Sequence, residues 1–281
     1  MTPSIAYRRS EQLALSLAVV LLTVCVSPSL AQPVPIEVPE ARQDSTPSQA
    51  PSTPSAPTPR TRGYVTFGGG YHATQKDFSD GAVKRINAED GRYDTSYTVG
   101  GGPGIDVAAG FTLWRRLGLR VGVGSFFTST EANVQASVPH PFFFSKPRSV
   151  SGEAQGLKRN EFALGAHLGG LFPLGARAMV TVFAGPTWFQ VTQGMVTDFT
   201  YTDSYPYDTA SFGSAVTSDS SGSAIGFGGG AGLGYFFTKA VGLAVSAQYS
   251  QGDVALPGAA GTTPSVKAGG FTAGFGLAVR Y

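Results

Sequence analysis

Residues 271–281, which end the chain, read Phe-Thr-Ala-Gly-Phe-Gly-Leu-Ala-Val-Arg-Tyr. Apolar side chains occupy every odd position, whereas small or polar residues occupy the even positions. Successive side chains of a β-strand point to opposite faces of the sheet. The stretch is therefore predicted to be a strand with one continuous apolar face and one face of small residues.

The same period of two recurs upstream, most clearly over residues 105–113, 225–237 and 241–250. In each stretch, apolar residues alternate with residues that are mainly Gly, Ala, Ser or Thr, which is typical of strands that have two different environments. Extending this pattern along the chain predicts eight strands, near residues 63–73, 103–114, 117–131, 156–172, 178–194, 222–237, 241–252 and 266–281.

The predicted connections alternate in length. Short turns are expected at 114–117, 173–177 and 238–240, and the other four connections run from roughly a dozen to nearly thirty residues. An even number of strands, with short turns at one end and long loops at the other, is typical of outer-membrane barrels. A soluble barrel would instead have an apolar interior. We therefore expect an all-β, eight-stranded antiparallel up-and-down transmembrane β-barrel over residues 63–281; a water-soluble β-sandwich is the alternative.

Composition excludes several other classes. The chain has 38 glycines and only 14% charged residues, and its formal net charge of +2 gives no reason to expect a nucleic-acid partner. Gly226 to Ala231 matches a dinucleotide-binding string, but the match lies inside an alternating strand and not at a strand-to-helix turn. We predict no cofactor.

The first residues have the layout of a secretory signal. Arg8 and Arg9 precede an apolar stretch at 13–26, and Ala31 ends a small-x-small cleavage site. Residues 1–31 are therefore expected to be a signal peptide cleaved after Ala31. Residues 32–62, rich in Pro, Ser and Thr, cannot bury enough apolar surface to fold, which predicts a disordered periplasmic linker.

The ending with Phe275, Leu277, Val279 and Tyr281 resembles the aromatic-terminated assembly signal of small outer-membrane barrels. Together with the strand layout, it makes residues 63–281 similar to the eight-stranded superfamily of OmpA-type transmembrane domains and the OmpX and OmpW barrels. The resemblance implies a monomer in the bacterial outer membrane, in contact with outer-membrane lipid and inserted by the barrel-assembly machinery.

An eight-stranded barrel is just wide enough to be filled by its own side chains. Alternation directs five polar residues into this interior, where charges are costly unless they are paired. We predict a salt-bridge ladder that plugs the barrel; a gated or proton-linked path is the alternative. The residues are Asp106, Arg120, Glu161, His167 and Arg280.

Catalysis would require a nucleophile beside an activating base. None of His72, His140 and His167 lies beside a lipid-facing serine in an alternating strand, and the aspartates of the loop at 195–221 lack the spacing of a calcium loop. We therefore predict no catalytic, cofactor-binding or metal-binding residue.

Function is expected to reside in the long extracellular loops, through a structural or surface-interaction role with an extracellular ligand or protein. Two alternatives remain: a narrow channel or transporter for small or apolar solutes, as OmpW-like barrels imply, and a lipid-modifying enzyme. Phe142, Phe143 and Phe144 either pack into the barrel mouth or contact lipid or a partner.

Overall fold

The computed structural model describes residues 62–73 and 76–281. The expected signal peptide with Ala31, and the linker up to residue 61, lie outside these residues. Among the described residues, no helix is long and apolar enough to cross a membrane. The elements are ten strands and one 3-10 turn: β1 (Gly63–His72), β2 (Lys76–Ile86), β3 (Glu89–Val99), β4 (Gly102–Trp114), β5 (Leu117–Val138), β6 (Arg148–Leu174), β7 (Ala178–Asp203), β8 (Ala210–Phe236), β9 (Val241–Ala255), η1 (Ala259–Gly261) and β10 (Ser265–Arg280).

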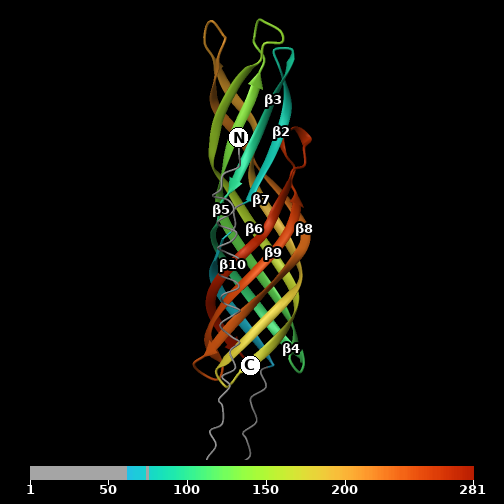
Figure 1. Ribbon diagram of the computed structural model, residues 1–281, viewed down its shortest axis with the longest axis vertical. Coiled ribbons are helices and arrows are strands. Elements are labelled where there is room, and N and C mark those ends of the chain that lie inside the picture. Colours follow the sequence, from blue (N-terminus) through green and yellow to red (C-terminus); the bar gives the residue numbers. More distant parts are fainter. Residues whose placement is uncertain (1–61, 74–75) are drawn as a thin grey trace, which may run out of the picture. The chain divides into compact units, whose positions relative to one another are not determined.

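Eight of the strands close a barrel in the order β1, β4, β5, β6, β7, β8, β9 and β10, with β10 paired back to β1 (Figure 1). Every pairing is antiparallel, and Phe67 closes the ring by pairing with Leu277 on one side and Val107 on the other. The predicted all-β, up-and-down barrel is confirmed. Both ends of the described barrel chain meet at the short-turn end, where Arg62 N donates to Tyr281 O at 2.8 Å.

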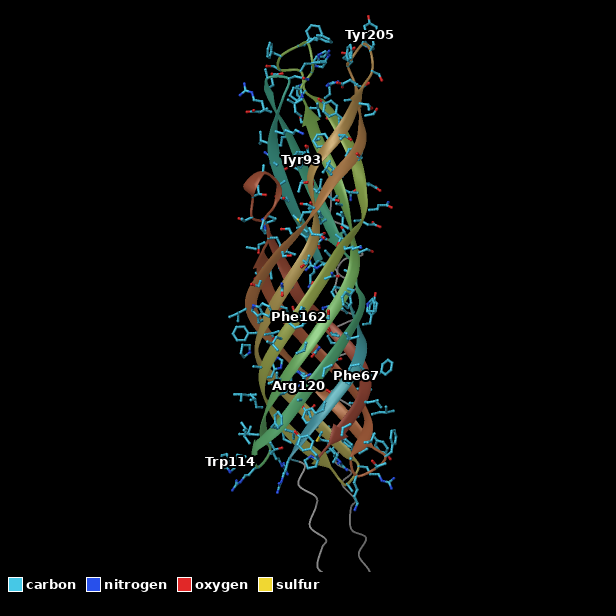
Figure 2. The ribbon with its side chains drawn as sticks, turned by 180° about the vertical axis from the view of Figure 1, so that it is seen from behind. Phe67, Tyr93, Trp114, Arg120, Phe162 and Tyr205 are labelled. Atoms are coloured by element: carbon cyan, nitrogen blue, oxygen red, sulfur yellow. The ribbon has the colours of Figure 1, made fainter. Side chains whose placement is uncertain are left out.

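The outer wall nearest the short turns carries a belt of exposed apolar side chains. Phe67 is 61% exposed, Leu233 45% and Phe275 75%, and Figure 2 shows Phe67 pointing away from the wall. Such a belt is unfavourable in water and fits the hydrocarbon of a bilayer. Phe126 and Phe236 lie inside the barrel, because their neighbours Phe127 and Phe237 take the outward positions of the alternation.

The first long connection is a β-hairpin that the sequence did not reveal. β2 and β3 are joined by Asn87 and Ala88, both with positive φ (50° and 66°), as a two-residue hairpin turn with matching twist requires. β3 then pairs with the upper part of β5, Arg92 with Ser137 through Val99 with Thr130. The hairpin thereby adds two strands beside the barrel at its long-loop end (Figure 1).

β5 to β8 continue well beyond the predicted strand ends, and the polarity of their faces inverts on the way. On β5 the outward residues up to Phe127 are apolar except for Ser125, whereas Ser129, Glu131 and Asn133 follow on the same face. The inward face of β5 changes in the opposite sense, from small or polar residues to buried apolar ones such as Ala132 and Val134. An apolar inside and polar outside is the pattern of a structure in water. The barrel therefore consists of a lipid-facing wall and a water-facing extension.

Buried apolar clusters fill this extension. Tyr97 is 1% exposed, stacks on Phe78 with ring centres 4.4 Å apart, and its hydroxyl accepts a hydrogen bond from Val196 N at 2.8 Å. Burial raises the pKa of the Tyr97 phenol to about 12, so it stays neutral in its apolar surroundings. The extension is thus a packed body with its own core, and not a set of loose loops.

Candidate functional site

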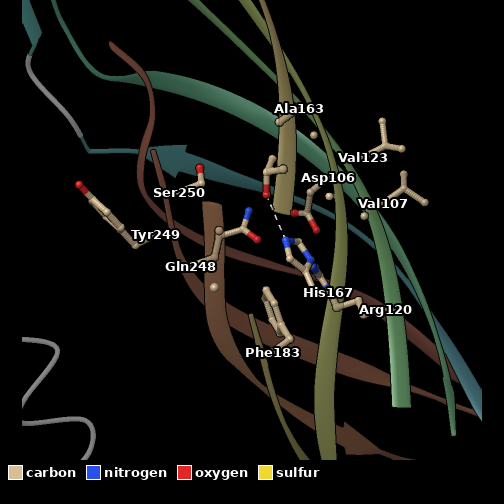
Figure 3. A pocket seen from close by; sticks show the side chains of 16 residues that line it. Asp106, Val107, Arg120, Val123, Ala163, His167, Phe183, Gln248, Tyr249 and Ser250 are labelled. Carbon is tan, nitrogen blue, oxygen red and sulfur yellow. Dashed lines mark hydrogen bonds between the residues drawn. The ribbon is translucent and has the colours of Figure 1, made fainter. Parts of the chain in front are cut away.

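The lumen of the lipid-facing wall holds a polar cluster around Arg120 of β5. Its Nη1 lies 3.3 Å from Nδ1 of His167, and Nε2 of that histidine lies 3.2 Å from the Thr187 hydroxyl, the contact marked by the dashed line in Figure 3. The Arg120 guanidinium carbon stands 3.9 Å from the centre of the Phe183 ring, a cation–π arrangement. These side chains from β5, β6 and β7 block the middle of the barrel.

Glycine on the inner face gives the large lumen residues their space. A Cβ on Gly165 would lie 2.2 Å from the His167 ring, and one on Gly110 would lie 2.2 Å from the Tyr64 ring. Both distances are far inside van der Waals contact. The small residues that alternate with the apolar belt are therefore required by the few large side chains that fill the lumen.

Asp106 faces the same interior from β4. It lines three small cavities, of about 50, 40 and 60 Å³, that lie along the lumen. Because a water needs roughly 10–15 Å³ of such volume, each cavity holds a few water molecules at most. The cavities can therefore hydrate Asp106 and Arg120, but they are too small for a solute-sized passage.

A second ionic cluster crosses the lumen nearer the extension. Arg159, which is fully buried, donates to Glu161 Oε1 from both Nε (2.8 Å) and Nη2 (2.6 Å). Lys76 Nζ of β2 lies 3.4 Å from the same oxygen and also donates to Gly269 O, while Gly269 N donates to Glu161 Oε2 at 2.9 Å. This cluster joins β2, β6 and β10 across the barrel and seals it on that side.

Apolar clusters adjoin both polar clusters. Phe189 and Val191 pack with Leu256 beside Glu161, and Phe189 lines the same small cavity as that carboxylate. At the short-turn end Tyr64, Phe236 and their neighbours close the lumen; the full cluster comprises Tyr64, Leu171, Met179, Phe236 and Ala278. Polar and apolar layers together fill the barrel along its length.

The five predicted interior residues fall in three places, and the structure therefore differs from a single ladder. Arg120, His167 and Asp106 share the central cavities, and Glu161 belongs to the second cluster. Arg280 lies at the short-turn end, where it donates to Lys239 O and Ala176 O at 2.9 Å each. Its guanidinium carbon also stands 4.1 Å from the centre of the Phe236 ring, so Arg280 helps to close the short-turn end and not the centre of the lumen beside Arg120.

Two ionic residues of the lumen were missed by sequence reasoning. Arg159 stands two residues before Glu161 on the same strand face, which was a usable signal. Lys76 lies in the unpredicted hairpin, and nothing in its local sequence indicates that it reaches the barrel interior.

The residues of the expected assembly signal lie on the lipid-facing side of the last strand. Phe275 is 75% exposed, Leu277 55%, Val279 43% and Tyr281 58%. Recognition by an assembly machinery stays a prediction for these four positions.

The histidines are occupied by structural contacts. Nδ1 of His72 lies 3.1 Å from the Thr272 hydroxyl, and its ring packs 4.5 Å from that of Phe126. Nδ1 of His140 accepts from the backbone N of Phe142 and Phe143, at 3.1 and 3.2 Å. Over residues 62–73 and 76–281, no group of three or more His, Cys, Asp or Glu side chains is placed to hold a metal ion.

The far end of the extension presents an aromatic tip, which we define as Phe142, Phe143, Phe144, Tyr205 and Tyr207. The three phenylalanines are 68%, 60% and 76% exposed, and Tyr205 is 88% exposed, at the outermost point in Figure 2. Packing of the Phe142–Phe144 triplet into the barrel mouth, one of the two expectations, is therefore wrong. The triplet faces outward from the loop between β5 and β6.

Arg148 fixes the tip by joining two hairpin loops. Its Nη1 donates to Asp203 Oδ1 at 2.5 Å and to Tyr207 O at 3.2 Å, and its Nη2 donates to Pro139 O at 3.0 Å. The rings of Phe142 and Tyr207 meet edge to face at 5.2 Å. The Arg148 side chain is buried, and its charge-assisted bonds to both loops hold them as one platform.

One family model and several solved structures match the chain. The model of the outer membrane protein beta-barrel domain family matches residues 48–278. The comparison with curated proteins gave no match to the chain. Among solved structures, the outer membrane protein OprG from Pseudomonas aeruginosa is 10% identical with a TM-score of 0.42, over 79% of this chain and 97% of that one. Neisserial surface protein A is 15% identical with a TM-score of 0.37, over 78% of this chain and 97% of that one. The outer membrane protease OmpT from Escherichia coli is 9% identical with a TM-score of 0.43, over 82% of this chain and 99% of that one.

Proposed function

Because the chain belongs to the outer membrane protein beta-barrel domain family, we propose that it is a closed barrel of the bacterial outer membrane that holds a binding platform above the cell surface. In this proposal the lipid-facing wall is an anchor, and the extension with its aromatic tip carries the activity. The role is that of a surface-interaction protein.

The observation that carries this proposal is the rigid, exposed tip. An apolar group in water is unfavourable, and adjacent exposed phenylalanines typically mark an interaction site. Here the backbone of Phe142 and Phe143 is held by His140, and the loop is tied to its neighbour by Arg148. A platform held in one conformation loses little entropy on binding, which favours recognition.

The filled lumen supports the same proposal. Arg120 stacked on Phe183 and the Arg159–Glu161 pair occupy the path that a diffusing solute would need. In an eight-stranded barrel such side chains leave no aqueous channel.

Export and insertion are part of the proposal. We infer that residues 1–31 are removed after Ala31, that residues 32–62 tether the barrel on the periplasmic side, and that the last strand carries the assembly signal. Deletion of Tyr281 should lower the yield of folded barrel in the outer membrane, measured by the gel shift between unboiled and boiled samples.

Two measurements test the main proposal. Purified barrel in a planar bilayer should give no stepwise conductance, and bacteria that display it should adhere to other cells more than bacteria that display F142S/F143S/F144S. Stepwise conductance in the wild type, with equal adhesion by the variant, would overturn the proposal. The gel shift on boiling shows that each variant is folded.

One observation favours a second candidate, a lateral path for small apolar solutes. The ladder between β6 and β7 pairs Gly165 with Thr187 and resumes at Leu168 with Ala184, so it passes over two positions. Pro186 stands at this interruption and has no N–H to donate. The gap adjoins the cavity lined by Gly165 and Thr187. A wall opened here would connect lipid with that cavity.

The Pro186→Ala variant separates the two candidates. It restores a backbone donor in the ladder and leaves the tip unchanged. A lateral path predicts that wild-type protein speeds the entry of a small apolar dye into vesicles and that P186A slows it. Equal entry for wild type, P186A and protein-free vesicles leaves the anchored platform as the function.

A further inference from the structure

We propose that the aromatic tip inserts into the lipid surface of a second membrane that faces the cell. This inference rests on the proposed surface-interaction function and names the partner as a bilayer with little net charge. It concerns the tip alone and requires no passage through the barrel.

The tip stands too far from its own bilayer to insert there. Phe127 is the last large apolar residue on the outward face of β5, and the strand continues to Val138 before the loop of the tip begins. At ~3.3 Å per residue and a tilt of ~40°, this places the tip roughly 25–30 Å above the lipid-facing belt. A lipid partner must therefore belong to another membrane.

The chemistry of the loop suits lipid better than a hydrogen-bonding ligand. The side chains of Phe142, Phe143 and Phe144 have no polar atom, so they offer no directional contacts of the kind that specify a sugar or a peptide. Aromatic residues are favoured at the boundary between lipid and water. Insertion of ~5–10 Å, the usual depth of an interfacial anchor, would cover the three rings.

The loop backbone is also prepared for a low-dielectric environment, where an unpaired N–H is costly. Phe142 N and Phe143 N both donate to His140 Nδ1, and Ser145 N donates to Glu89 Oε1 at 2.8 Å. These three donors of the loop are thus satisfied within the protein before any partner is bound.

Charge at the tip favours a zwitterionic surface over a polyanion. Lys146 pairs with Asp208 at 2.7 Å, and Arg148 pairs with Asp203 at 2.5 Å. These four residues carry no net charge, so there is no excess of cations to attract acidic lipid or an acidic polysaccharide. Association is therefore expected to depend on the phenyl rings and to vary little with salt.

Flotation of the full barrel in nanodiscs with phosphatidylcholine vesicles tests the inference. Wild-type protein is expected to float with the vesicles equally at low and high salt, and F142S/F143S/F144S is expected to bind at least tenfold less. Replacement of the same three residues by Trp, which also favours the interface, should retain binding. The matched control V83S/V216S removes exposed apolar side chains from the flank of the extension and should bind as wild type. Empty nanodiscs must stay unbound.

The results distinguish lipid insertion by the tip from the proposed surface-interaction function. If wild type fails to float but the F142S/F143S/F144S variant still loses adhesion to cells, lipid is not the partner and the surface-interaction role stands. Binding that requires anionic vesicles, disappears in salt and survives the Phe replacements would also overturn the lipid assignment. If neither adhesion nor flotation depends on the three phenylalanines, both the inference and the proposed function fail.

Discussion

Glu161→Gln is the most informative change to the sealed lumen. The carboxylate accepts two bonds from Arg159, which is fully buried, and lies 3.4 Å from Lys76. The amide keeps an acceptor but removes the negative charge, so two cations are left without a counter-charge inside the barrel. Removing one partner of a buried ion pair costs about 3–5 kcal/mol. We expect a loss of about 3 kcal/mol of unfolding free energy, because the remaining acceptor retains part of the interaction.

Equilibrium unfolding in urea, followed by tryptophan fluorescence in micelles, measures this loss through Trp114 and Trp188, the two tryptophans of the chain. Lys76→Met is the matched control, since it leaves one cation facing one carboxylate and no uncompensated buried charge; it should cost about 1–2 kcal/mol, chiefly for the lost bond to Gly269 O. The double variant K76M/E161Q should recover part of the E161Q loss. If E161Q unfolds within ~0.5 kcal/mol of wild type, or if K76M is the more damaging change, the cluster does not stabilise the barrel as argued.

Three further predictions concern other parts of the barrel. Val245→Arg on the lipid-facing belt should cost about 2–4 kcal/mol of folding free energy in vesicles, whereas Gln251→Arg, beyond the belt on the same strand, should cost less than ~1 kcal/mol. The free energy of unfolding should fall as the pH rises from 10 to 12, because the Tyr97 phenol ionises near pH 10 in the unfolded chain but only near pH 12 in the folded one. The fall amounts to roughly 2.7 kcal/mol, and the Y97F variant should not show it. Asp80→Ala should speed proteolysis of the loop around η1, because Asp80 Oδ2 accepts from Ala259 N and Asp80 Oδ1 accepts from Thr262 Oγ1. A cleavage rate equal to wild type would show that these two bonds do not hold the loop.

The lipid-facing wall could be predicted from the sequence because the bilayer imposes one rule on every strand. Outward residues are predominantly apolar, so Phe275, Leu277 and Val279 repeat with the two-residue period of the strand. The extension obeys the opposite rule, since it stands in water. The alternation that keeps apolar residues on the outward face ends at Phe127, although the strand continues to Val138.

A second reason lies in β6, where an extra residue shifts the phase of the alternation. Thr130 pairs with Leu157 and Ala132 pairs with Ala154, and Gly156 takes a φ of +74° at this bulge. Inward-facing residues of β6 therefore have even numbers before Gly156 and odd numbers after it. A fixed period of two cannot cross such a point, which explains why the predicted strand begins at 156 and the observed one at Arg148.

Alternation gives the face on which a residue lies but not its depth along the barrel, and depth decides which residues meet. Arg120 and Arg280 were both expected inside, yet one stacks on Phe183 in the middle of the lumen and the other donates to carbonyl groups at the short-turn end. The same limit applies to the aromatic tip. The sequence shows three adjacent phenylalanines, but only the length of the strands beneath them places the rings far above their own bilayer. It is this height that makes a second membrane, and not the surrounding lipid, the surface they can reach.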